Sequence, residues 1–146
     1  MVESHEYPIT LRWTGGKQGV TGSPDGLPAL TVAAPPEFGG PAGVWSPEHL
    51  FVNALASCVM TTFLAIAELS KLTVKHLEVP ATGTLERGED RRYRISRIVV
   101  RPRVGIASEG ERDKALRLLE KTEQVCLITN SIRSEVVLEP TIDVVP

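Results

Sequence analysis

The apolar positions of this chain change their spacing from one part of the sequence to the next. Over 7–34, short runs of apolar and β-branched residues are separated by a glycine reversal at 14–16 and a Pro-Asp-Gly turn at 24–26. These reversals supply the backbone freedom that tight turns need, so the segment predicts a small antiparallel meander. Residues 35–45 follow with three prolines and three glycines, which predict a loop without regular structure.

The middle of the chain holds one long apolar run, 50–67. Ser46 at the N-cap, Pro47 at the first helical position and Glu48 in the first turn predict a helix that begins there and runs to about Lys71. Because this helix is apolar on nearly all sides, we expect it to be buried at the centre of the fold and covered from several directions.

The same run approaches the roughly 18 residues of a transmembrane candidate. Polar residues interrupt its interior, and charges lie close to both of its ends. We therefore expect the core helix of a soluble domain and no membrane partner. The interrupting residues are Asn53, Ser57, Thr61 and Thr62, and the flanking charges are Glu48 and Glu68.

The second half of the chain returns to alternation with a period of two residues. Segments 73–87 and 91–106 predict two longer strands joined as a hairpin through 88–90. Ser108 and Glu111, in the spacing of a capping box, then predict the start of a second helix.

This second helix carries one apolar stripe, so we expect one side to pack and the other to face water. The stripe consists of Ala115, Leu118, Leu119 and Thr122. A final strand over 134–145 is interrupted by Pro140, which suits an edge or a bulge. The predicted class is α+β: a buried central helix and a second amphipathic helix gathered on one face of a mainly antiparallel sheet.

Composition excludes several classes of protein. The 146 residues are 42% hydrophobic and 23% charged, the balance of one ordinary globular domain over 1–146. A net charge of -2 gives no electrostatic reason to expect a nucleic acid. Two cysteines are too few for a secreted disulfide scaffold, and Glu3 and Glu6 do not fit a signal peptide, so we expect a cytoplasmic protein.

The two cysteines are the candidate chemistry. Cys58 falls in the middle of the long helix, too far from the helix N-terminus for the dipole to lower its pKa, so a cation would have to come from elsewhere. Cys126 follows the second helix, and the two helices could bring both thiols within disulfide range. From the residues alone, plain packing of two buried thiols remains the more frequent explanation.

Two motifs around the cysteines resemble those of the OsmC/Ohr superfamily, the osmotically inducible protein C and organic hydroperoxide resistance proteins. The stretch SPEHLF at 46–51 leads to ALASC at 54–58, with GGP at 39–41 ahead of it. The second cysteine opens CLITNS at 126–131. The likeness extends from TGGKQG at 14–19 to the last strand, so the chain is expected to be a single OsmC-like domain.

The resemblance implies a peroxidase without a cofactor. Cys58 would attack an organic hydroperoxide, with hydrogen peroxide as a further candidate substrate, and would become a sulfenic acid. Cys126 would then form a disulfide with it, and a dithiol, often on a lipoylated protein in this family, would reduce that disulfide. An apolar wall would admit the alkyl group, and its candidates are Phe51, Leu55, Met60 and Phe63.

The resemblance also implies an intertwined homodimer with active sites at the subunit interface. Glu48 lies ten residues before Cys58, about 15 Å along a straight helix, so it reaches the thiol only if the helix bends or a second subunit supplies it. In the family an arginine pairs with this glutamate, and here Lys17 replaces it. Lysine keeps the positive charge but lacks the planar guanidinium group that binds a carboxylate through two hydrogen bonds. The family's proline after the second cysteine is Leu127.

Other functions stay open at this point. Because Lys17 replaces the family's arginine, a second function stays possible: a thiol sensor or small-molecule carrier with the same fold and little peroxidase activity. A metal site would need converging ligands, and His5, His49 and His76 show no ligand spacing. A serine hydrolase would need a GxSxG elbow, which the sequence lacks. The charges of the arginine-rich segment 87–103 are balanced by Glu86, Glu89 and Asp90, so a solvated sheet face explains it better than a nucleic-acid site.

Overall fold

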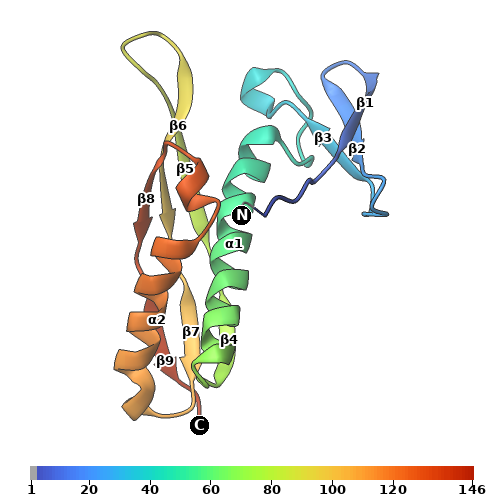
Figure 1. Cartoon of the computed structure of the whole chain (residues 1–146). Helices are drawn as coiled ribbons and strands as arrows, with labels where there is room; N and C mark the ends of the chain where they lie inside the picture. The colour runs from blue at the N-terminus through green and yellow to red at the C-terminus, as the bar shows by residue number, and fades with distance from the viewer. Residues whose placement is uncertain (1–2) are drawn as a thin grey trace. The chain divides into compact units, whose positions relative to one another are not determined.

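The computed structural model describes residues 3–146 (Figure 1). Their backbone contacts divide the chain into two compact units, one up to Leu50 and one from Phe51 to Pro146. The fold is of the predicted α+β class, with two α-helices and strands that pair mainly antiparallel.

The first unit contains the predicted meander. Strands β1 (Thr10–Gly15), β2 (Gln18–Gly22) and β3 (Leu30–Ala33) pair antiparallel in that order. Gly15 and Gly16 both have positive φ at the first reversal, where only glycine is free of strain. The loop that follows is more regular than expected, because it contains the short 3-10 helix η1 (Pro36–Phe38).

The long helix α1 (Pro47–Leu69) begins as predicted. The side chain of Ser46 accepts a hydrogen bond of 3.1 Å from the His49 N–H, which satisfies a free donor of the first turn. The helix ends two residues earlier than Lys71. Lys71 itself adopts a left-handed conformation with φ 57°, and Leu72 N–H returns to the Ala67 carbonyl at 2.9 Å, which closes the helix.

The predicted hairpin is present, but a proline splits each of its long strands in two. Each split strand gives two shorter strands in succession. They are β4 (Val74–Glu78) and β5 (Ala81–Arg87), then β6 (Tyr93–Val100) and β7 (Arg103–Ile106), and last β8 (Glu135–Leu138) and β9 (Thr141–Val144). The hairpin is formed because β5 pairs antiparallel with β6 and β4 with β7. Pro80, Pro102 and Pro140 occupy the three breaks. Proline has no N–H to continue a ladder, so the strands form two sheets, β4-β7-β9 and β5-β6-β8.

The last two strands pair in parallel, β8 with β6 and β9 with β7, whereas the other pairs are antiparallel. Helix α2 (Arg112–Val125) follows the 3-10 helix η2 (Glu109–Glu111). The predicted capping box is not formed, because Ser108 precedes η2 rather than α2 and its side chain makes no capping hydrogen bond. The predicted buried stripe is present, with Ala115, Leu119 and Thr122 fully buried.

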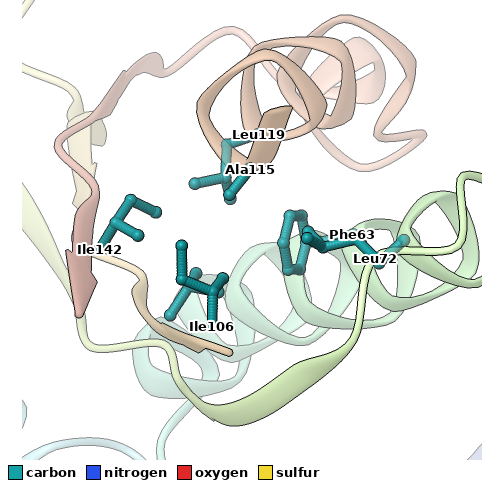
Figure 2. Packing of buried hydrophobic residues seen from close by; sticks show 8 residues of the cluster. Phe63, Leu72, Ile106, Ala115, Leu119 and Ile142 are labelled. Carbon is teal, nitrogen blue, oxygen red and sulfur yellow. The ribbon is translucent and has the colours of Figure 1, made fainter. Parts of the chain in front are cut away.

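Two core clusters lie in the second unit. The first gathers side chains from α1, α2, β7 and β9 around Phe63, Ile106 and Leu119 (Figure 2). The second, which we call the cysteine cluster, contains Leu55, Val59, Ile98, Val100 and Cys126, with Cys58 packed against it.

Helix α1 is covered on one face only, which corrects the expectation of a helix buried from several directions. Its buried residues recur every fourth position, at Leu55, Val59, Phe63 and Ala67. Other apolar side chains stay open, including Leu64 at 41% exposure. By length and composition the helix is apolar enough to cross a membrane, and 22% of its most apolar stretch is buried in the fold. The hydrophobic pattern marks surface to be covered, and it does not say which chain covers it.

Candidate active site

The two cysteines lie together in the second unit. Cys58 is half-buried on α1, and Cys126 is fully buried at the C-terminal end of α2, where its N–H bonds to the Thr122 carbonyl at 2.8 Å. Both are free thiols, and their side chains share a hydrogen bond. The fold thus brings into contact two residues that are 68 positions apart in the sequence (126 minus 58).

The turn after Cys126 presents its backbone to the first thiol. Asn130 N–H bonds to the Cys126 carbonyl at 3.1 Å, and the chain continues into the 3-10 helix η3 (Thr129–Ser131). This tight path directs the backbone groups of Leu127 and Ile128 to hydrogen-bond with the sulfur of Cys58. Short turns of this kind make anion-binding concavities because successive N–H groups point to one place.

Helix α1 adds a hydroxyl to the same sulfur. Thr62 lies four residues after Cys58, one turn along the helix, and its Oγ1 is 3.7 Å from the cysteine Sγ. When the sulfur is a thiolate it can only accept, so the threonine hydroxyl donates. Cys58 therefore has donors from its own helix and from the turn that follows the second cysteine.

These contacts shift the pKa values of the two thiols in opposite directions. Burial works to raise the pKa of Cys58, but hydrogen bonds from Cys126, the Ile128 backbone, Thr62 and the Leu127 backbone together lower that pKa below its ordinary value. For Cys126, burial raises the pKa first, and the hydrogen bond it donates to Cys58 raises it further. Of the two thiols, Cys58 therefore ionises first, with the Cys126 thiol as a donor beside it.

The sequence directed attention to a cation as the stabiliser of Cys58, and the groups found beside it in the second unit are neutral donors. Thr62 could have been found from its position one turn beyond Cys58. The backbone groups of Leu127 and Ile128 carry no sequence signal, because every residue except proline has an N–H.

Glu48 and Lys17 both belong to the first unit. Glu48 is half-buried, and its Oε2 is buried without a hydrogen-bond partner among residues 3–146. Burying a carboxylate oxygen without a hydrogen-bond partner costs folding free energy, so Glu48 is a candidate to bind a group that these residues do not supply. Lys17 Nζ donates to the Phe38 carbonyl at 2.9 Å, which ties the β1-β2 reversal to the end of η1.

The four candidate wall residues are placed differently from one another. Leu55 is fully buried in the cysteine cluster. Phe51 lies two turns before Cys58 on α1 and is 37% exposed. Phe63 belongs to the other core cluster. Met60, two residues beyond Cys58, points about 200° around the helix from it, on the exposed side.

No group of three or more histidine, cysteine, aspartate or glutamate side chains within residues 3–146 is arranged to hold a metal ion. The arrangement has the parts that thiol redox chemistry needs. One thiol ionises readily, a second lies within reach of it, and apolar side chains surround both.

Comparison with known proteins identifies the family. The sequence profile of the family described as OsmC-like protein matches residues 40–141. The chain therefore belongs to the OsmC-like family, as its motifs predicted.

Individual relatives are distant in sequence but cover nearly the whole chain. It is 25% identical over 138 residues to the uncharacterized protein YmaD of Bacillus subtilis, covering 92% of this chain and 91% of that protein. It is also 25% identical over 132 residues to an organic hydroperoxide resistance protein-like 2 of Staphylococcus epidermidis, covering 89% and 90%.

Solved structures show the same fold. An OsmC-like protein of unknown function from Vibrio cholerae superposes with a TM-score of 0.86 at 23% identity, covering 94% of this chain and 99% of that one. An organic hydroperoxide resistance protein from Elizabethkingia anophelis superposes with a TM-score of 0.77 at 22% identity, covering 98% and 99%.

Proposed function

We propose that this protein is a thiol-dependent peroxidase that reduces organic hydroperoxides. The observation that carries the proposal is the contact between Cys58, whose pKa is lowered, and Cys126, which stays protonated. A thiolate is the nucleophile for peroxides, and an adjacent thiol protects the oxidised product from further oxidation. Some relatives in the family are named for organic hydroperoxide resistance, which supports the same reaction class.

The reaction proceeds in two steps on the protein. The Cys58 thiolate attacks the distal oxygen of the hydroperoxide, so an S–O bond forms, the O–O bond breaks, and the alkoxide leaves as an alcohol after taking a proton. Cys126 then attacks the resulting sulfenic acid, so a disulfide forms and water leaves. An external dithiol restores both thiols by exchange, and a lipoylated protein is the reductant we propose.

Leu55 and Phe51 are the wall residues that we retain for the alkyl group. Leu55 packs in the same cluster as both cysteines, and Phe51 lies on the same side of α1 as Cys58. We propose that the reaction takes place in the cytoplasm, where the cellular reductants keep thiols reduced.

We propose further that the active form is a homodimer in which the partner subunit completes the site. Glu48 is ten helical positions from Cys58, so a partner is the simplest source of a glutamate near the thiolate. Four large apolar side chains in and just before β1 are open to solvent, as expected for a surface that another chain covers. They are Tyr7 at 84%, Ile9 at 61%, Leu11 at 52% and Trp13 at 76% exposure.

The test is peroxide consumption coupled to mass mapping of the thiols. With cumene hydroperoxide in modest excess, the wild type should form a Cys58–Cys126 disulfide, and dihydrolipoamide should reduce it faster than thioredoxin does. Cys58→Ser should abolish consumption. Cys126→Ser should allow one turnover and then accumulate sulfenic or sulfinic acid on Cys58. Consumption by Cys58→Ser at the wild-type rate would reject the proposal.

A thiol sensor or small-molecule carrier is the second candidate function, and the observation that favours it is Lys17, which stands where the family pattern has an arginine. In the peroxidase, Lys17→Arg should raise the rate because the fork engages a carboxylate with two parallel hydrogen bonds. A wild-type thiol that stays reduced under peroxide while a ligand binds would favour the carrier.

A further inference from the structure

A charged groove opens at the end of the second unit that includes the β5-β6 hairpin. It has a volume of about 480 Å³, within the size range of small-molecule sites. Its lining comes from the start of α1, the turn between β5 and β6, the first residues of β6 and the segment before β8. The charged side chains on it are Asp90, Arg92, Arg94 and Arg133, which sum to a net charge of +2 (three arginines minus one aspartate).

Among the described residues, two of the three arginines have no counterion. Arg94 forms an ion pair of 3.1 Å with Asp90, which is the acidic residue found on the lining within 3–146. Neither Arg92 nor Arg133 forms an ion pair or a side-chain hydrogen bond within that range. Glu86 and Glu89 line an adjoining recess, where the Ser96 hydroxyl donates to the Glu86 carboxylate, and neither acid forms an ion pair with Arg92 or Arg133 among the described residues.

The backbone around both free arginines is fixed by hydrogen bonds. At the hairpin turn, the Arg92 N–H bonds to Asp90 Oδ1 at 3.0 Å and its carbonyl accepts from Gly88 at 2.9 Å. On the other side, the Ser134 hydroxyl donates to the Ile95 carbonyl, which ties the segment of Arg133 to β6. The two guanidinium groups are therefore carried by anchored elements rather than by free loops.

The rest of the groove offers apolar surface. Phe51 and Ile95 line it together with the ring of Tyr93. Ile95 also packs against the cysteine cluster, so the groove and the two thiols share a side chain. Free guanidinium groups beside apolar and aromatic surface suit a ligand that has both an anionic head and an apolar body.

We propose that this groove is a binding site for a small organic anion, with Arg92 and Arg133 holding a carboxylate or phosphate head and Phe51 and Ile95 contacting an apolar body. The groove shares Phe51 with the wall proposed above for the alkyl group, but binding of the anion does not require the thiol chemistry. Each arginine supplies a planar pair of N–H donors that matches the two oxygens of such a head.

Isothermal titration of the reduced full-length protein with sodium octanoate tests the proposal. Octanoate should bind at one site per chain, whereas octanol, which lacks the charge, and acetate, which lacks the chain, should each bind at least about tenfold more weakly. Inorganic phosphate and octyl phosphate distinguish a free phosphate from an organic one, and octyl phosphate should bind the more tightly of the two.

Variants assign the site. Arg92→Gln and Arg133→Gln should each weaken octanoate about tenfold, the usual worth of a charge-assisted hydrogen bond. Arg97→Gln is the matched control, because Arg97 is an exposed arginine of β6, the strand that begins directly after Arg92, and lies outside the groove. Circular dichroism of each variant confirms that the fold is retained. Phe51→Ala should weaken octanoate but leave the affinity for acetate unchanged.

Three outcomes would overturn the proposal. Binding that Arg97→Gln weakens as much as Arg92→Gln would show general charge attraction. Equal affinity for octanoate and inorganic phosphate would show that the apolar body of the ligand contributes nothing to binding. Absence of octanoate binding, together with a changed self-association constant in Arg92→Gln, would identify a second copy of the chain as the occupant.

Discussion

The thiol of Cys126 donates a hydrogen bond to the sulfur of Cys58. This relationship gives the two thiols opposite tendencies, because the same bond lowers the pKa of Cys58 and raises that of Cys126. A pair arranged in this way has a nucleophile and a protonated neighbour before any peroxide arrives. The predictions below concern this pair, the hydroxyl beside it, the packing of the helix that carries Cys58 and the exposed apolar side chains around β1.

The first prediction concerns the pH dependence of thiol reactivity. Because the pKa of Cys58 is lowered in the folded protein, its thiolate is present at lower pH than that of an ordinary cysteine. The rate of alkylation by iodoacetamide should rise with pH around a midpoint below that of the same chain in urea. Cys126, which is fully buried, should react only after unfolding. A Cys58 midpoint at or above the unfolded value would contradict the proposed order of ionisation.

The second prediction isolates the hydroxyl beside Cys58. Thr62→Val removes a donor to the thiolate, so the alkylation midpoint should move to higher pH and peroxide consumption at neutral pH should fall about threefold to tenfold. Thr61→Val is the matched control, because the Thr61 hydroxyl bonds to the carbonyl groups of Ser57 and Cys58 instead. If both variants shift the midpoint equally, the effect belongs to the helix and not to the hydroxyl.

The third prediction tests how closely α1 packs on the sheet. A methyl group added at Gly83 of β5 would lie 2.5 Å from Val52 Cγ2 on α1, closer than real contacts allow. Gly83→Ala should therefore destabilise the protein by about 1 to 3 kcal/mol in urea unfolding, as overpacking of a core does. Gly110→Ala, where the nearest atom is at 4.0 Å, should be close to neutral. Equal stability of the two variants would mean that the helix can move away at no cost.

The fourth prediction concerns the exposed apolar side chains in and just before β1, which are Tyr7, Ile9, Leu11 and Trp13. If a second chain covers them, the protein should sediment as a dimer of about 32 kDa, twice the chain mass of 15.9 kDa. Trp13→Asp should weaken dimerisation about tenfold or more, because large aromatic residues carry much of the energy of an interface.

Leu27→Asp is the control for this fourth experiment. Leu27 is 60% exposed and lies between β2 and β3, outside the strand that carries Trp13. We expect the same dimer for this variant as for the wild type. A wild type that sediments as a monomer at micromolar concentration would reject the dimer and the delivery of Glu48 by a partner.

Several elements followed from local sequence chemistry. The start of α1 at Ser46 and Pro47 is set by capping and by the missing donor of proline, which act within one turn. The meander was predictable because its reversals need glycine. The splitting of the strands could also have been anticipated from Pro80, Pro102 and Pro140. That the three breaks lie side by side on neighbouring strands depends on the register between the strands, which the sequence does not state.

By itself, the sequence determined the α+β class, the membership of the family through its two cysteine motifs, and which residues carry the redox chemistry we propose. Only the tertiary structure decided that Cys126 meets Cys58, and that the donors beside that thiol are Thr62 and the backbone of Leu127 and Ile128. The physical reason is that motifs record local preferences and residue types. A hydrogen bond to sulfur depends on where a distant turn places its N–H groups, and that position follows from the packing of the whole unit.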